Sequence, residues 1–227
     1  MDTPAAASPP ASVFSWRLVA VLFAASGLMV PLGLGLRPVH LQWFDSSHFP
    51  TIAGSMETWI WSFRILVFGL FLRVGALSAL SAFPWRDDVR PLLQAGITIC
   101  VLGCLVSALG SGYYMDTGVW GSWAIKQRVG LDAKAMLMDD LRPVNAWGEC
   151  LIRMGSVFFC LGSIFVGSAL LRARFLSPVL GWFPIAYGVV GICVGMFMAN
   201  DVPATIAVMV VHALWCVGMA FAMRTPV

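Results

Sequence analysis

Long hydrophobic runs separated by short polar stretches dominate the pattern along this chain. A helix needs about 20 mainly apolar residues to cross a bilayer, whose hydrocarbon core is about 30 Å thick. Six runs are long enough, at residues 17–36, 58–83, 91–113, 146–171, 176–199 and 204–223. The pattern therefore predicts an all-α fold, a polytopic transmembrane helical bundle with six spans, within a single domain at residues 16–224.

Two polar segments lie outside the predicted spans. Residues 1–15 are rich in Pro, Ala and Ser, and we expect them to form a disordered cytoplasmic tail. Residues 114–145 are expected to form an outer loop, in which a short helix begins at an Asp132 cap and ends at Pro143. We interpret this segment as a lid lying on the membrane surface, and a lid over a substrate is the alternative.

The composition excludes a water-soluble domain. Hydrophobic residues make up 59% of the chain and charged residues 11%, whereas soluble domains carry about 25% charged residues. The net charge of +3 is spread over short loops, so no basic run could neutralise many phosphates and nucleic acid is excluded as a partner. The lipid bilayer is the predicted partner, and other membrane subunits or self-association stay open.

Arginines gather in the segments that would share one side of a six-span bundle. They are Arg17, Arg86, Arg90, Arg172, Arg174 and Arg224. Because basic residues in short loops are retained in the cytoplasm, this distribution predicts a multi-pass protein of the cell membrane with both termini cytoplasmic.

Charged residues inside the spans are candidates for a ligand or proton pathway, because charges in lipid are costly and tend to face the bundle interior. Glu149 and Arg153 are one helical turn apart, and we interpret them as a local ion pair. Arg64 lies close enough to the outer end of its span to reach the headgroups or to turn inward toward Glu149. Arg73 lies deeper in the same span, where it could reach the inner leaflet or a buried partner.

His212 lies close to the middle of the sixth predicted span, too deep for its side chain to reach water. An imidazole there could relay protons, bind haem or recognise a ligand. The alternative that we favour is a neutral imidazole that is hydrogen-bonded across helices. No second histidine lies within the spans, so a bis-histidine haem site is not supported, and we expect no cofactor.

The segment before the second span offers metal-ligand residue types in His40, Asp45 and His48. Their spacing matches no compact metal motif, so they are weak candidates for a metal site. The six cysteines all lie in apolar segments, where thiols act as small packing residues. The chain contains no P-loop, GxSxG or HExxH motif.

The C-terminal half carries two short motifs that suggest a family. Gly-Ser-Ala-Leu-Leu-Arg172 is followed by Phe-Leu-Ser-Pro178-Val-Leu-Gly181-Trp182, and the sixth span contains His-Ala-Leu-Trp215-Cys-Val-Gly218. These motifs resemble the bacterial six-helix membrane proteins that contain domain of unknown function 4386, in which an acidic residue is expected at or near His212. The resemblance implies a protein of the bacterial inner membrane and implies no known activity.

Three functions are compatible with these features. The favoured one is a non-catalytic accessory, assembly or regulatory membrane component, because small residues such as Gly69, Gly75, Gly162 and Gly167 allow close helix approach. The second is a small proton- or solute-coupled transporter, which requires His212 and the intramembrane Arg and Glu residues to face one cavity. The third is a membrane enzyme, which requires an outer His/Asp site that includes Asp116.

Overall fold

The computed structural model describes residues 13–38, 48–127, 131–174, 176–198 and 202–223. These residues form helices and no strand. The helices are α1 (Val13–Gly35), α2 (Phe49–Gly54), α3 (Met56–Ser81), α4 (Arg90–Gln127), α5 (Leu131–Ala173), α6 (Pro178–Phe197) and α7 (Val202–Ala222).

Every helix except α2 is long and apolar enough to cross a membrane. The six candidate spans are Trp16–Gly35, Met56–Ser81, Arg90–Ala124, Asp139–Ala173, Pro178–Phe197 and Pro203–Ala222. The predicted six-span helical bundle is therefore confirmed. The first, the second and the last two spans lie within two residues of their predicted bounds, whereas the third extends to Ala124 and the fourth begins at Asp139.

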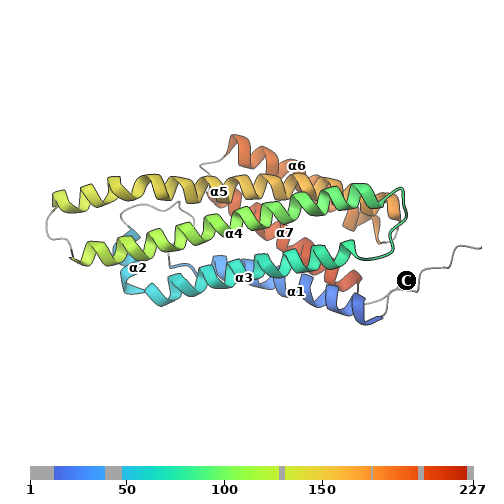
Figure 1. Cartoon of the computed structure of the whole chain (residues 1–227), viewed down its shortest axis with the longest axis horizontal. Helices are drawn as coiled ribbons and strands as arrows, with labels where there is room; N and C mark the ends of the chain where they lie inside the picture. Colours follow the sequence, from blue (N-terminus) through green and yellow to red (C-terminus); the bar gives the residue numbers. More distant parts are fainter. Residues whose placement is uncertain (1–12, 39–47, 128–130, 175, 199–201, 224–227) are drawn as a thin grey trace, which may run out of the picture.

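The helices pack as an elongated bundle in which sequence neighbours run antiparallel (Figure 1). The α4–α5 contact is the most extensive, and α5 also packs against α6. Helix α1 lies between α3 and α7. The beginning of α1 and the end of α7 lie at the same end of the bundle, on the right in Figure 1, as an even number of spans requires.

Glycines set the close approach of α4 and α5. A Cβ atom at Gly103 would lie 2.6 Å from the carbonyl oxygen of Gly155, and one at Gly96 would lie 2.9 Å from that of Gly162. These distances leave no room for a side chain, so the two backbones touch. Small residues are the usual means by which membrane helices approach so closely.

The described part of segment 114–145 is helical, so the prediction of a loop with a short helix was wrong. Helix α4 has 38 residues and α5 has 43, which correspond to about 57 and 65 Å at 1.5 Å per residue. Both helices therefore project beyond a hydrocarbon core of about 30 Å. They continue along the bundle axis at the left of Figure 1.

Pro143 lies inside α5 and does not end it. A proline removes one backbone donor, a loss that packing against neighbouring elements can offset. Here the projecting part of the hairpin is supported by α2, whose Phe49 packs against the backbone at Gly121 of α4. The indole of Trp59 adds a hydrogen bond to the carbonyl oxygen of Met115, at 3.1 Å.

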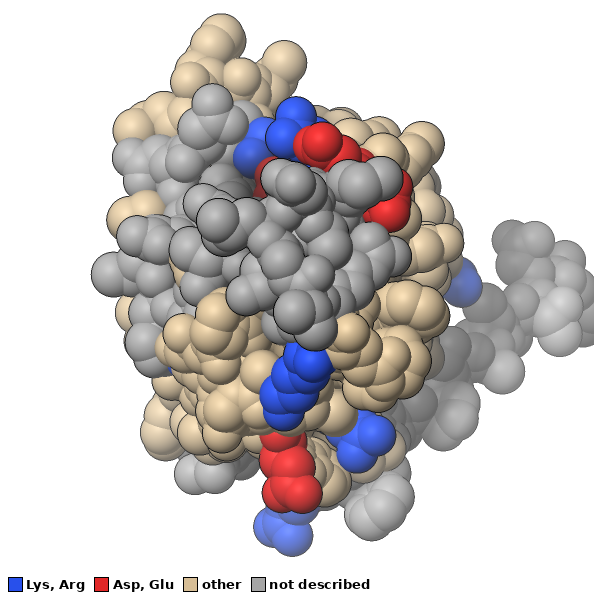
Figure 2. All heavy atoms as spheres, turned by 90° about the vertical axis from the view of Figure 1, so that its left-hand side faces the viewer, with Lys and Arg blue, Asp and Glu red and all other residues tan. Residues whose placement is uncertain are grey.

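The end of the molecule at which the hairpin projects carries charges of both signs. Figure 2 shows Lys and Arg beside Asp and Glu on this end. One exposed pair there is Arg142 with Asp139, whose nitrogen and oxygen lie 3.1 Å apart. Exposed tryptophans also mark this half of the hairpin, namely Trp120, Trp123 and Trp147.

Candidate functional site

A cluster of buried polar side chains lies halfway along the bundle. Ser26, Tyr187 and His212 come from the middle of the spans Trp16–Gly35, Pro178–Phe197 and Pro203–Ala222. Arg73 of α3 reaches the same level, since its Nε donates a hydrogen bond to the Ser26 hydroxyl, at 3.1 Å. The cluster is thus about 15 Å from either end of these spans, given 1.5 Å of rise per residue.

His212 belongs to a continuous chain of hydrogen bonds that joins α5, α6 and α7. Its Nδ1 lies 2.6 Å from the Tyr187 hydroxyl, and that hydroxyl donates to Ser163, at 2.6 Å. The Ser163 hydroxyl in turn donates to the carbonyl oxygen of Phe159, at 2.8 Å. Since the single hydroxyl proton of Tyr187 is used toward Ser163, His212 donates from Nδ1.

The second nitrogen of His212 lies 3.4 Å from the Cys216 sulfur, one turn further along α7. With Nδ1 protonated, Nε2 is free to accept the weak thiol donor, which describes a neutral imidazole. Both ring nitrogens therefore have partners. This geometry fits the interpretation of His212 as a hydrogen-bonded neutral side chain.

Arg73 differs from His212 because its hydrogen bonding is incomplete. The side chain is only 4% exposed, and its Nη2 atom has no hydrogen-bond partner. The guanidinium carbon lies 5.3 Å from the centre of the Phe159 ring, and the Cys216 thiol lies beside the guanidinium. No ion pair in the described part of the chain involves Arg73.

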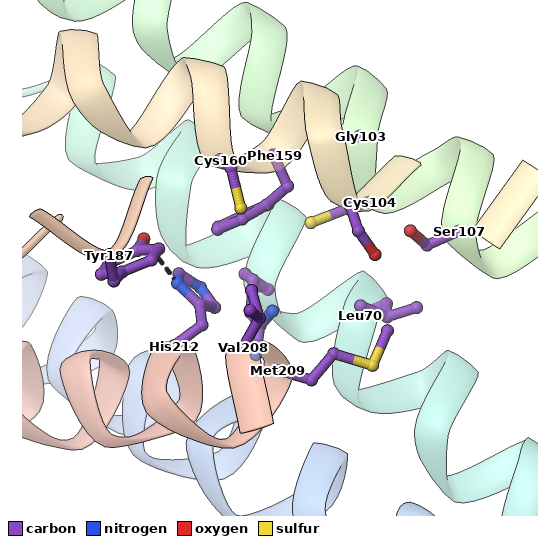
Figure 3. A pocket seen from close by; sticks show the side chains of 12 residues that line it. Leu70, Gly103, Cys104, Ser107, Phe159, Cys160, Tyr187, Val208, Met209 and His212 are labelled. Atoms are coloured by element: carbon purple, nitrogen blue, oxygen red, sulfur yellow. Dashed lines mark hydrogen bonds between the residues drawn. The ribbon is translucent and has the colours of Figure 1, made fainter. Parts of the chain in front are cut away.

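Arg73 and His212 line one small cavity of about 30 Å³, enough for about two water molecules. Figure 3 shows His212 and Tyr187 joined by their hydrogen bond on one side, and Cys104 and Ser107 on the other. Arg73 is the one charged residue in this lining, because the imidazole of His212 is neutral and no lining residue is acidic. The cavity therefore has a largely apolar lining that carries one uncompensated positive charge.

Helical spacing explains why α4 presents polar groups to this cavity. Cys100, Cys104 and Ser107 follow an i, i+4, i+7 pattern, which places them on one face of the helix. All three are buried. Thiols and hydroxyls are small, so this face also allows the close approach to α5.

The other charged candidates do not line the cavity. Glu149 and Arg153 form a partly buried ion pair at 3.4 Å, and the Asn145 amide donates to the same carboxylate, at 2.9 Å. Arg64 is exposed, with its guanidinium carbon 5.2 Å from the centre of the Trp61 ring. The structure thus brings Arg73 together with His212 and keeps the other three apart from them.

The structure describes only one of the three candidate metal ligands, His48. His40 and Asp45 lie outside the described residues. His48 directly precedes α2 and is buried. Within the described ranges, no three His, Cys, Asp or Glu side chains form a group that could hold a metal ion.

Arg37 lies outside the spans, directly after α1. Its guanidinium carbon is 4.4 Å from the centre of the Phe63 ring, a cation–π contact that joins the end of α1 to α3. Burial lowers the pKa of Arg37 to about 10, against a smaller raising effect from Tyr114. The group therefore stays protonated at neutral pH.

Sequence reasoning missed Tyr187, Ser163 and Ser107 as members of the cluster. Tyr187 lies at the centre of its span, where a tyrosine is unusual because membrane tyrosines favour the interface. The central position of Tyr187 therefore indicated a polar contact inside the bundle. The two serines gave no comparable signal, since serine is common wherever membrane helices pack closely.

Comparisons with known proteins identify no relative. No protein-family model matches the chain, and no curated protein or solved structure is significantly similar to it. The resemblance to domain of unknown function 4386 therefore stays a prediction.

Proposed function

We propose that this multi-pass membrane protein is a small transporter that binds a polar solute in the middle of its helical bundle. The observation that carries the proposal is the buried guanidinium of Arg73, which has an unpartnered Nη2 and lines a cavity shared with His212. An intramembrane charge that is directed into a cavity is a functional site by default, because lipid makes it expensive to keep. Charges within membrane helices usually pair with one another or with backbone carbonyls, whereas Arg73 has no ion pair among the described residues.

The main support for an accessory role is weaker than the sequence suggested. Three of the glycines that could dock a partner are used inside the chain, since Gly69 packs on Val30, Gly162 on Cys100 and Gly167 on Gly181. The accessory role stays a prediction without a specific contact behind it. The enzyme hypothesis also stays untested, because it depends on His40 and Asp45.

A transporter must open this site to water. Arg73 and His212 are 4% and 2% exposed, so we expect helices to shift relative to one another before a solute contacts these two side chains. Rigid-body movement around a central site is the usual way in which transporters provide such access. The α6–α7 contact is sparser than the α5–α6 and α1–α7 contacts, which favours movement of α4, α5 and α6 against α1, α3 and α7.

We also propose that both termini face the cytoplasm. Arg17 near the start of α1 and the arginine-rich connections between α3 and α4 and between α5 and α6 would then be cytoplasmic. The α4–α5 hairpin would project outward. Placement in a bacterial inner membrane rests on the family resemblance alone.

The proposal is tested by flux into liposomes that contain the purified full-length protein. Suitable probes are chloride, nitrate, formate and acetate, with ammonium and glycerol as a cation and a neutral solute. We expect at least one probe to enter faster than into protein-free liposomes, and Arg73→Met to abolish the difference. Arg64→Gln is the matched control, because this arginine lies on the same helix but is exposed and outside the cavity. Entry of all six probes at the protein-free rate would contradict the proposal.

A further inference from the structure

We infer that the cavity beside Arg73 is a binding site for a small monovalent anion. This inference rests on the proposed function and names the class of solute that the same site takes. Three features of the site support it, namely the charge on the lining, the hydrogen-bond donors that face the cavity, and its size.

The charge requires compensation. Moving a cation from water into a low-dielectric interior costs several kcal/mol, even after relaxation of the protein around it. A nearby carboxylate is the usual compensation, but no ion pair in the described ranges includes Arg73. The ring of Phe159 and the Ser26 hydroxyl contact the guanidinium, yet neither carries a negative charge. A bound anion would supply it.

The groups around the cavity suit an anion and not a cation. The Nη2 atom of Arg73 has an N–H group to donate, and the Ser107 hydroxyl and the Cys104 thiol line the same space. No carboxylate lines it. A cation placed there would meet the positive guanidinium without any acidic group to stabilise it.

The size of the cavity limits the anion. A volume of about 30 Å³ accommodates about two water molecules, which corresponds to a halide or to an anion of three or four heavy atoms. One guanidinium neutralises one negative charge. Chloride, nitrate and formate each carry one negative charge and fit this volume. Sulfate carries two negative charges, and gluconate is too large for the cavity.

Binding is tested on the full-length protein in detergent, by thermal unfolding at constant ionic strength in chloride, nitrate or formate against gluconate. A ligand of the folded state raises Tm with the logarithm of its concentration. We expect this rise in the wild type and in Arg64→Gln, and we expect it to be absent from Arg73→Met. The absence of a rise for all three anions in the wild type would overturn the inference. So would an equal rise in Arg73→Met, or a larger rise with sulfate.

Two further measurements keep the test decisive if Arg73→Met does not fold. In Ser107→Ala, the loss of a hydrogen bond to a charged ligand is expected to weaken binding about tenfold to a hundredfold. In the wild type, chloride binding is expected to broaden the ³⁵Cl resonance, and nitrate or formate should reverse the broadening by competition. An unbroadened resonance, or unchanged affinity in Ser107→Ala, would overturn the inference.

These experiments separate the inference from the proposed transport. Anion binding in detergent without any flux into liposomes would retain the anion site and refute the transporter. Flux of ammonium or glycerol without anion binding would retain the transporter and refute the anion site.

Discussion

Replacing Gly103 with alanine tests the close contact between the backbones of α4 and α5. The added Cβ would lie 2.6 Å from both the carbonyl oxygen of Gly155 and the amide nitrogen of Phe159. Side-chain carbons do not approach backbone atoms so closely, and neither atom belongs to a flexible side chain. The two helices must therefore move apart by several tenths of an ångström.

The expected penalty follows from the size of that displacement. Overpacking a well-packed core typically costs about 1–3 kcal/mol. Replacing glycine by alanine within a helix also contributes about 0.5–1 kcal/mol of stabilisation through helix propensity. Gly112→Ala is the matched control on the same helix, because a Cβ there has no atom within 4 Å. The difference between the two variants isolates the steric effect.

The assay is thermal unfolding in detergent, followed by tryptophan fluorescence. For a chain of this length, each kcal/mol corresponds to about 2–4 °C in Tm. We expect Gly112→Ala to unfold at or above the wild-type temperature and Gly103→Ala to unfold below it. If Gly103→Ala were as stable as Gly112→Ala, the backbones of α4 and α5 would not be in contact, and the reasoning would be refuted.

Three further predictions follow from other parts of the structure. Tyr187→Phe removes the hydroxyl that joins His212 to α5 and should lower the free energy of unfolding by about 1–3 kcal/mol. Denaturant titration measures this change, and an unchanged free energy would argue against the hydrogen-bond chain. Phe49→Ala removes the contact of the Phe49 ring with α4 and should increase protease cleavage near α2. The Tm of the spans should stay within a few degrees of the wild-type value, and unchanged cleavage would contradict the docking of α2. In intact cells, a membrane-impermeant maleimide should label Lys126→Cys and not Arg86→Cys, and the reverse result would invert the proposed orientation.

The prediction of the fold succeeded where it depended on hydrophobic length. The span Trp16–Gly35 was predicted at 17–36 and Pro178–Phe197 at 176–199. Lipid imposes this length on each segment separately, so it can be read along the chain without knowledge of its neighbours.

The prediction failed where neighbours decide the outcome. Polar residues after Tyr113 and the proline at position 143 indicated a loop, yet α4 continues to Gln127 and α5 begins at Leu131. Contacts of the hairpin with Phe49 and Trp59 stabilise helix beyond the bilayer. Tertiary packing of this kind overrides local propensity. The residues that provide it are distant in the sequence, since Trp59 is 56 residues from Met115 and Phe49 is 73 residues from Ser122.

The candidate site likewise has features that the sequence determines and features that only packing decides. By itself, the sequence determined that Arg73 and His212 lie in membrane spans, because the cost of an ionisable group in lipid depends only on its own depth. It could not determine which of them lacks a partner. The tertiary structure decided that by joining His212 to Tyr187 and Ser163 and by giving Arg73 no ion pair among the described residues. Hydrogen bonds form at about 3 Å between residues from different helices, and such distances are a property of the packed bundle alone.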